Sequence, residues 1–272
     1  MKRFALLALT LMLATTAFAQ KKGGGAAGPE TQNTPPPTRV PVGPGPKTKP
    51  EAEAVQAMLQ ARAQSPDATI QAVDTLVTKF PKSDFKAFAL YTEANAWQQK
   101  NDLAKSQVFA EQALAADPKN YDADILIANV LATTTKDTDF DMNDKLTQAE
   151  KYAHDALDIL ATGGKPVLFQ MTEEVWTKVK NEDISQAWQA IGTAALVRKK
   201  TDDAVAAYQK GLDVNPDPFL MIRAGRALMA ARKFDDAIAY DDKVLAMPDA
   251  PAQAKTIATS DKSRAAAAKG QK

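Results

Sequence analysis

One sequence pattern recurs at an offset of 33 or 34 residues, and it restricts the chain to folds that are built from repeated units. Gly192 corresponds to Gly225 at an offset of 33, and Leu90 corresponds to Asp124 at an offset of 34. Self-similarity at such a period is typical of solenoids, in which each unit buries its apolar face against the next unit. The sequence therefore predicts a stack of similar units rather than a fold with a single central core.

Each unit has the pattern of a helix-turn-helix hairpin. Apolar or small residues at helical spacing mark one face of a first helix, and in one unit they are Trp188, Ile191, Gly192 and Ala195. A polar turn at 199–202 follows, and a second helix then ends at Asn215-Pro216. The pattern predicts two helices in every unit.

At these residues the sequence resembles the tetratricopeptide repeat family, whose pattern is W-x2-L-G-x2-Y, then A-x3-F, then P. The clearest copy, 185–217, carries this pattern at Trp188, Ile191, Gly192, Ala204, Tyr208, Leu212 and Pro216. Further copies are expected at 51–83, 87–120, 121–160 with an insertion, and 218–248, followed by a capping helix at 252–269. The resemblance implies an all-α, right-handed α-solenoid of helix-turn-helix hairpins over residues 51–269.

Three features depart from the regular repeat. Glu93 occupies a position where an apolar residue is expected, and the insertion 133–147 lengthens one copy. A further segment, 163–183, belongs to no repeat and is expected to hold a helix at 172–180 that carries Trp176. Insertions in solenoids often lie on the binding face, but an aromatic residue in such a segment can also fill a junction between repeats. The sequence leaves both interpretations open.

The N-terminal residues have the pattern of a targeting signal. Lys2 and Arg3 precede an apolar run, which ends at the cleavage-type sequence Ala17-Phe18-Ala19. This order is typical of a secretory signal peptide over residues 1–19. Residues 20–50 hold 8 of the 16 prolines and 6 of the 12 glycines, so we expect a disordered linker there. We expect an exported bacterial-type protein, periplasmic or secreted, that has no transmembrane segment after cleavage.

Composition argues against several classes of function. The chain has no cysteine, which excludes thiolate metal sites. It has one histidine, so a Ser-His-Asp triad would have to use His154. Its 34 basic and 33 acidic residues are balanced, unlike the basic surface of a nucleic-acid-binding protein. The acidic segment 137–148 resembles a calcium loop but has Met142 and Gln148 where that loop needs Gly and Glu. We expect no catalytic residues, cofactor or metal.

The resemblance also implies a binding surface, because in this family the first helices of successive hairpins line a concave face that holds a peptide or a partner helix. Transferred position by position, the partner-binding residues are Phe88, Tyr91, Asn95, Gln98, Ile125, Asn129, Gln189, Thr193, Phe219, Ile222, Arg226 and Met229. Asn95 and Asn129 occupy the position at which an Asn often binds the peptide backbone. The lysine of a carboxylate clamp is absent, since Tyr91 and Ile125 stand at its position.

These features favour a non-catalytic adaptor or scaffold in the cell envelope whose partner is another protein, bound as a peptide or a helix. The alternative is a structural protein that binds an envelope glycan or peptidoglycan through the basic linker 20–50, which has five Lys or Arg residues against one Glu. The identity of the partner, the oligomeric state and the choice between periplasm and exterior cannot be predicted from these patterns.

Overall fold

The computed structural model describes residues 44–165, 168 and 171–270, and within them it contains eleven α-helices and no strand. The expected signal peptide and residues 20–43 of the expected linker lie outside this part of the chain. The helices are α1 (Lys49–Ala61), α2 (Pro66–Lys79), α3 (Lys86–Gln99), α4 (Leu103–Ala116), α5 (Tyr121–Thr134), α6 (Met142–Ala161), α7 (Glu173–Val197), α8 (Thr201–Val214), α9 (Pro218–Ala230), α10 (Phe234–Ala246) and α11 (Ala252–Lys269).

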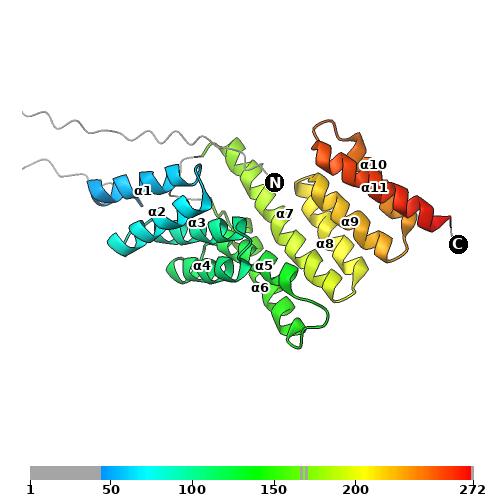
Figure 1. The fold of residues 1–272 in the computed structure, drawn as a ribbon, viewed down its shortest axis with the longest axis horizontal. Coiled ribbons are helices and arrows are strands. Elements are labelled where there is room, and N and C mark those ends of the chain that lie inside the picture. Colours follow the sequence, from blue (N-terminus) through cyan, green and yellow to red (C-terminus); the bar gives the residue numbers. More distant parts are fainter. Residues whose placement is uncertain (1–43, 166–167, 169–170, 271–272) are drawn as a thin grey trace, which may run out of the picture. The chain divides into compact units, whose positions relative to one another are not determined.

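The helices form consecutive pairs, α1 with α2 through α9 with α10, and α11 packs on the last pair. They follow one another in chain order, as Figure 1 shows. Apolar clusters link neighbouring pairs: one runs from α3 to α6 and includes Ala194 of α7, and another joins α7 and α8 to α9 and α10. Each pair therefore buries its apolar face against the next pair, as expected of an α-solenoid.

Three of the short turns between paired helices share one backbone geometry. Asn101, Lys199 and Arg232 each have φ between 60° and 63°, in the left-handed region. In each turn the amide of the next residue bonds a carbonyl five residues back, as in the bond from Asp102 N to Trp97 O of 3.0 Å. This is the Schellman arrangement that ends a helix, here formed with residues other than glycine.

The structure differs from the sequence-based expectation at the segment 163–183. Instead of a separate helix at 172–180, α7 is one helix of 25 residues, and its second half is the first helix of the copy at 185–217. Thr172 caps its start, because the Thr172 side chain accepts a hydrogen bond from Val175 N. Trp176 is 7% exposed and packs against Tyr121, with ring centroids 6.3 Å apart. The extra half of α7 is thus a packing element that covers α5 and α6.

The last residues of the expected linker also differ from expectation, because they contact the helical domain. Gly45 N donates a hydrogen bond to Asp84 Oδ2 at 3.2 Å, and Lys47 Nζ forms an ion pair with the same carboxylate at 2.9 Å. Thr48 caps α1 by accepting a hydrogen bond from Glu51 N. Asp84 has a pKa below its usual value, because Lys47 and the Gly45 amide hydrogen-bond its charged form. Contacts with the helical domain are therefore made by residues that precede α1.

Gly192 allows the closest helix approach that any glycine of the described chain provides. A Cβ atom at this position would lie 2.4 Å from ring carbons of Tyr208 on α8, and Tyr208 is 1% exposed. At the corresponding position of the next copy, Gly225, the nearest atom would be the Ala237 carbonyl oxygen at 3.4 Å. The same repeat position is thus tight between α7 and α8 but roomy between α9 and α10.

This difference gives a matched pair of substitutions. Gly192→Ala should lower the free energy of unfolding by about 1–3 kcal/mol, because the added methyl overpacks the contact with Tyr208. Gly225→Ala should raise it by about 0.5–1 kcal/mol, because alanine favours the helix and the space exists. Urea unfolding followed by circular dichroism measures both. Shifts of equal sign in the two variants would contradict this account of the packing.

Glu93, which departs from the repeat pattern, is buried on α3. It is 2% exposed, and its Oε1 accepts a hydrogen bond from Trp97 Nε1 at 3.1 Å. Burial raises the pKa of Glu93 to about 7, the charge of Asp74 adds to the rise, and the Trp97 hydrogen bond opposes it. The folded protein therefore holds a proton on Glu93 at pH values where the unfolded chain has lost it.

Stability should fall as the pH rises from about 5 to about 8, because the unfolded chain ionises Glu93 freely while the folded protein keeps this carboxyl group protonated up to a pH of about 7. Glu93 alone should account for about 3 kcal/mol, given a pKa of about 7 in the folded protein against an ordinary value of 4.5. Glu93→Gln resembles the protonated acid and should remove this part of the pH dependence. The measurement is urea unfolding of both proteins at the two pH values, and an identical loss in the two would show that Glu93 does not contribute.

Candidate functional site

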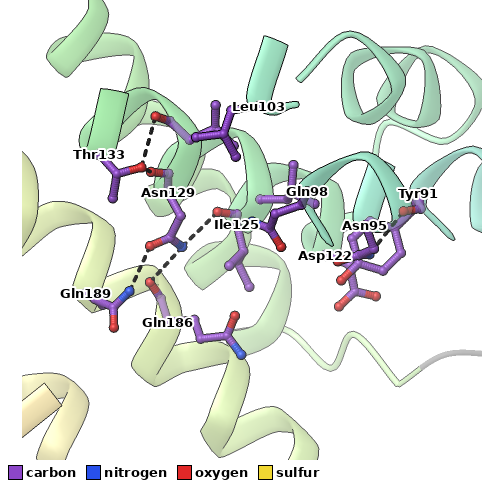
Figure 2. A pocket seen from close by; sticks show the side chains of 12 residues that line it. Tyr91, Asn95, Gln98, Leu103, Asp122, Ile125, Asn129, Thr133, Gln186 and Gln189 are labelled. Carbon is purple, nitrogen blue, oxygen red and sulfur yellow. Dashed lines mark hydrogen bonds between the residues drawn. The ribbon is translucent and has the colours of Figure 1, made fainter. Parts of the chain in front are cut away.

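A groove of about 240 Å³ lies where α3, α5 and α7 face one another (Figure 2). Six of the twelve residues expected on the binding face line it: Tyr91, Asn95, Gln98, Ile125, Asn129 and Gln189. The repeat pattern did not indicate the other six lining residues, which are Leu103, Asp122, Leu126, Val130, Thr133 and Gln186. The structure thus brings together expected residues from three successive first helices.

Helix periodicity explains why these side chains share one surface. On α3, Tyr91, Asn95 and Gln98 follow one another at steps of four and three residues, which keeps them on one face. On α5, the same steps continue the stripe of Ile125 and Asn129 back to Asp122 and on to Thr133. Extending the expected stripe by one turn in each direction would have found Asp122 and Thr133 from sequence alone.

Asn129 links α5 to α7. Its Nδ2 donates hydrogen bonds to Ile125 O at 2.9 Å and to Gln186 O at 3.2 Å, and its Oδ1 accepts one from Gln189 Nε2 at 3.1 Å (Figure 2). Both N–H groups of the amide are therefore engaged within the protein. Asn129 holds two helices together, and it keeps only one acceptor site on Oδ1 for a ligand.

Asn95 is bonded less completely. Its Nδ2 donates one hydrogen bond to Tyr91 O of the same helix at 3.0 Å. The side chain also hydrogen-bonds the Tyr91 hydroxyl, which partly opposes the rise in the pKa of Tyr91 that burial causes, while the two acceptor sites on the Asn95 oxygen receive no hydrogen bond from another residue of the described chain. Gln98, one turn further on, is exposed and also lines the groove. Of the two asparagines expected to bind a peptide backbone, Asn95 therefore has more hydrogen-bonding sites available for a ligand.

One end of the groove is acidic. Asp122 lines it, and burial raises the pKa of Asp122 while the Arg62 charge lowers it. Burial, and then the Asp122 charge, raise the pKa of Asp183 on α7 well above its usual value. Asp183 Oδ2 is buried without a hydrogen bond from the described residues, which agrees with a protonated carboxyl group. Asp122 at this end thus has a neighbouring carboxyl group, Asp183, which does not itself line the groove, and the structure disfavours charge on both.

Two expected residues lie on the same helices but outside the groove. Phe88 is partly buried against the cluster around Val73, with the Arg62 guanidinium 5.4 Å from its ring centroid. Thr193 donates a hydrogen bond to Gln189 O at 2.8 Å, and its hydroxyl lies 3.3 Å from the Tyr208 hydroxyl. Both side chains therefore contribute to packing within the repeats.

The four expected residues on α9 are not part of this groove either. Ile222 is 4% exposed and packs in the core between α9, α10 and α11, so we leave it out of the proposed surface. Arg226 is paired with Asp261 of α11, and Met229 packs partly buried on a core cluster. Phe219 is 38% exposed. The capping helix α11 contacts the face of α9 that the sequence analysis assigned to a partner, and this contact could not be deduced from the repeat pattern.

The chemistry of the groove is that of a binding surface with amide groups. In the described part of the chain, no group of three or more His, Cys, Asp or Glu residues is arranged to hold a metal ion. None of the described helices is long and apolar enough to cross a membrane. Side-chain amides can donate to and accept from a peptide backbone, and Tyr91 adds apolar contact area.

Comparison with known proteins agrees with a tetratricopeptide-like fold. No protein-family model matches the sequence, and no curated protein matches it. Solved structures do match. TTC0263, a thermophilic tetratricopeptide repeat protein of Thermus thermophilus, aligns with a TM-score of 0.56 and 14% identity, over 78% of this chain and 98% of that chain.

Two further structures align over most of their length. Pseudomonas aeruginosa pilF gives a TM-score of 0.53 at 16% identity, over 82% of this chain and 92% of that one. A double mutant of MamA RS-1 gives 0.51 at 12% identity, over 73% and 94%. At these identities the likeness concerns the fold alone, so we conclude that the helical domain has the tetratricopeptide-like fold that its repeat pattern predicted.

The different bonding of the two asparagines gives a stability prediction. Asn129→Ala should lower the unfolding free energy by about 1–2 kcal/mol, because it removes the links between α5 and α7 and leaves partly buried groups without partners. Asn95→Ala should change it by less than about 0.5 kcal/mol, since that side chain bonds only its own helix. Thermal unfolding of both variants measures this, and equal losses would contradict the structural role of Asn129.

Proposed function

We propose that this protein is a non-catalytic adaptor that binds another protein, as an extended peptide or a helix, in the groove between α3, α5 and α7. The observation that carries the proposal is the row of polar side chains with free bonding capacity along this groove, above all Asn95 and Gln98. A peptide backbone needs alternating donors and acceptors, and an amide side chain supplies both.

The groove combines these amides with apolar area. Tyr91, partly buried beside Asn95, supplies this area, whereas Ile125 and Leu126 in the wall are only 4% and 5% exposed and serve mainly as its floor. A partner side chain could rest on this area while its backbone bonds the amides. This mixture is typical of interfaces in which a buried centre is surrounded by polar groups.

The tetratricopeptide-like fold supports an adaptor rather than an enzyme, since its stacked first helices offer an extended surface instead of a closed pocket. The envelope location, periplasmic or secreted, is part of the proposal and depends on the signal peptide expected at residues 1–19. Glycan binding through the linker is the outcome to be considered if the groove takes no protein partner.

The test is affinity capture from an envelope extract with the parent protein and with Asn95→Ala/Gln98→Ala. Both residues lie in the groove, and neither substitution removes a core side chain, whereas Tyr91 packs on a core cluster and is better left unchanged. The matched control is Gln112→Ala/Gln253→Ala, which removes two exposed amides from α4 and α11.

The expected result is one protein that is enriched by the parent and the control and reduced about tenfold or more with the groove variant, a loss of about 1.4 kcal/mol or more in binding free energy. Circular dichroism must show equal helical content in all three proteins. Equal capture by the groove variant and the control would exclude the groove as the binding surface.

A further inference from the structure

A second hollow lies between α4, α5 and α6, lined by residues that do not line the groove. Its volume is about 460 Å³, and its apolar walls are formed by Leu114, Pro118, Tyr152 and Ile159. Asp124 of α5 lines it, and Asp124 is two residues after Asp122, which lines the groove. Residues two apart on a helix point to different sides, so the two sites lie on different faces of α5.

Asp124 places a carboxyl group at a repeat position where the preceding copy has an apolar side chain. It corresponds to Leu90 of the preceding copy, which is 4% exposed, and Asp124 itself is 3% exposed. No residue of the described chain donates a hydrogen bond to its carboxyl group or forms an ion pair with it. Burying a carboxylate without a partner is costly, so the Asp124 carboxyl group is held partly protonated, and a cationic group placed in the hollow would stabilise its ionised form.

The surroundings of Asp124 indicate what that group is. Two more carboxylates, Asp155 and Asp158, line the hollow, and Asp155 already pairs with Lys151 at 2.5 Å. Three carboxyl groups thus line the hollow against one lysine, Lys119, and this excess of acids attracts a cation. No group of three carboxylates in the described residues is arranged to hold a metal ion, and half of the lining residues are apolar or aromatic. A cation with an aliphatic chain matches both properties.

We propose that this hollow binds a primary ammonium group on an aliphatic chain, with the ammonium on the Asp124 carboxylate and the chain along Leu114 and Tyr152. A lysine side chain of a partner protein and a free alkyl diamine both have this chemistry. The proposal does not depend on the groove between α3, α5 and α7.

The pKa of Asp124 predicts how binding to this hollow should depend on pH. Burial, and then the charge of Asp155, raise the pKa of Asp124 to about 7, and Lys151 lowers it. Apart from the lining acids, the neighbouring charges are Glu111 on α4, which acts on Tyr152, and Lys119 in the turn before α5. An alkylammonium keeps its charge up to about pH 10. Binding should therefore be about tenfold weaker at about pH 6 than at about pH 8, where Asp124 is ionised.

The experiment is calorimetric titration of the full chain with two probes, 1,5-diaminopentane and Nα-acetyl-lysine methylamide, and with Nα-acetyl-norleucine methylamide as the uncharged control. The protein variants are Asp124→Asn and Asp124→Leu, with Asp117→Asn as the matched control on an exposed acid outside the hollow. Asp124→Leu restores the residue of the preceding copy and is expected to fold. Asn95→Ala tests the independence from the groove.

The proposal requires that at least one cationic probe binds the parent protein, that both Asp124 variants weaken binding about tenfold or more, and that Asp117→Asn and Asn95→Ala do not. Tighter binding of the lysine derivative than of the diamine would assign the site to a partner's side chain, and the reverse order would assign it to a free amine. Absence of binding, equal binding of the norleucine control, unchanged affinity in Asp124→Asn, or affinity independent of pH would each overturn the proposal. The pH series on the parent protein keeps the test valid if a variant fails to fold.

Discussion

Each helix pair of this protein has an apolar face that only the neighbouring pair can cover, and the rest of the structure depends on this constraint. Close contacts such as that of Gly192 with Tyr208 hold the two helices of a pair together, and the shared clusters hold pair to pair. Because α3, α5 and α7 line one groove, stripes from three successive first helices combine into one surface. The groove between α3, α5 and α7 is therefore a consequence of stacking.

The fold could be predicted from the sequence because the repeat pattern directly encodes local packing, at Trp188, Gly192 and Tyr208 for example. The continuity of α7 could not, because the repeat period restarts at 185 and suggested a break there. Residues 173–184 hold neither Gly nor Pro, however, so nothing in the chain stops the helix before that point. Helix-breaking signals were a better guide to this boundary than the repeat.

The candidate site could be predicted only in part, for a related reason. Periodicity placed Tyr91, Asn95 and Gln98 on one face of α3, but it could not tell which polar groups already have partners. Asn129 hydrogen-bonds α7, and Ile222 is buried against α10 and α11. These contacts join different helices, so the periodicity of one helix cannot reveal them. The carboxyl group of Asp124 shows the same limit, since sequence alone marks it as unusual but gives neither its burial nor the hollow beside it.

Photo-crosslinking in the cells that make the protein tests the central claim, protein binding in the groove, most directly. A photoreactive amino acid is placed at Gln98, an exposed position of the groove, and in a separate variant at Gln112, an exposed position on α4. The account predicts one discrete crosslinked protein from position 98 and none from position 112. The same crosslinks from both positions, or none from position 98, would contradict it.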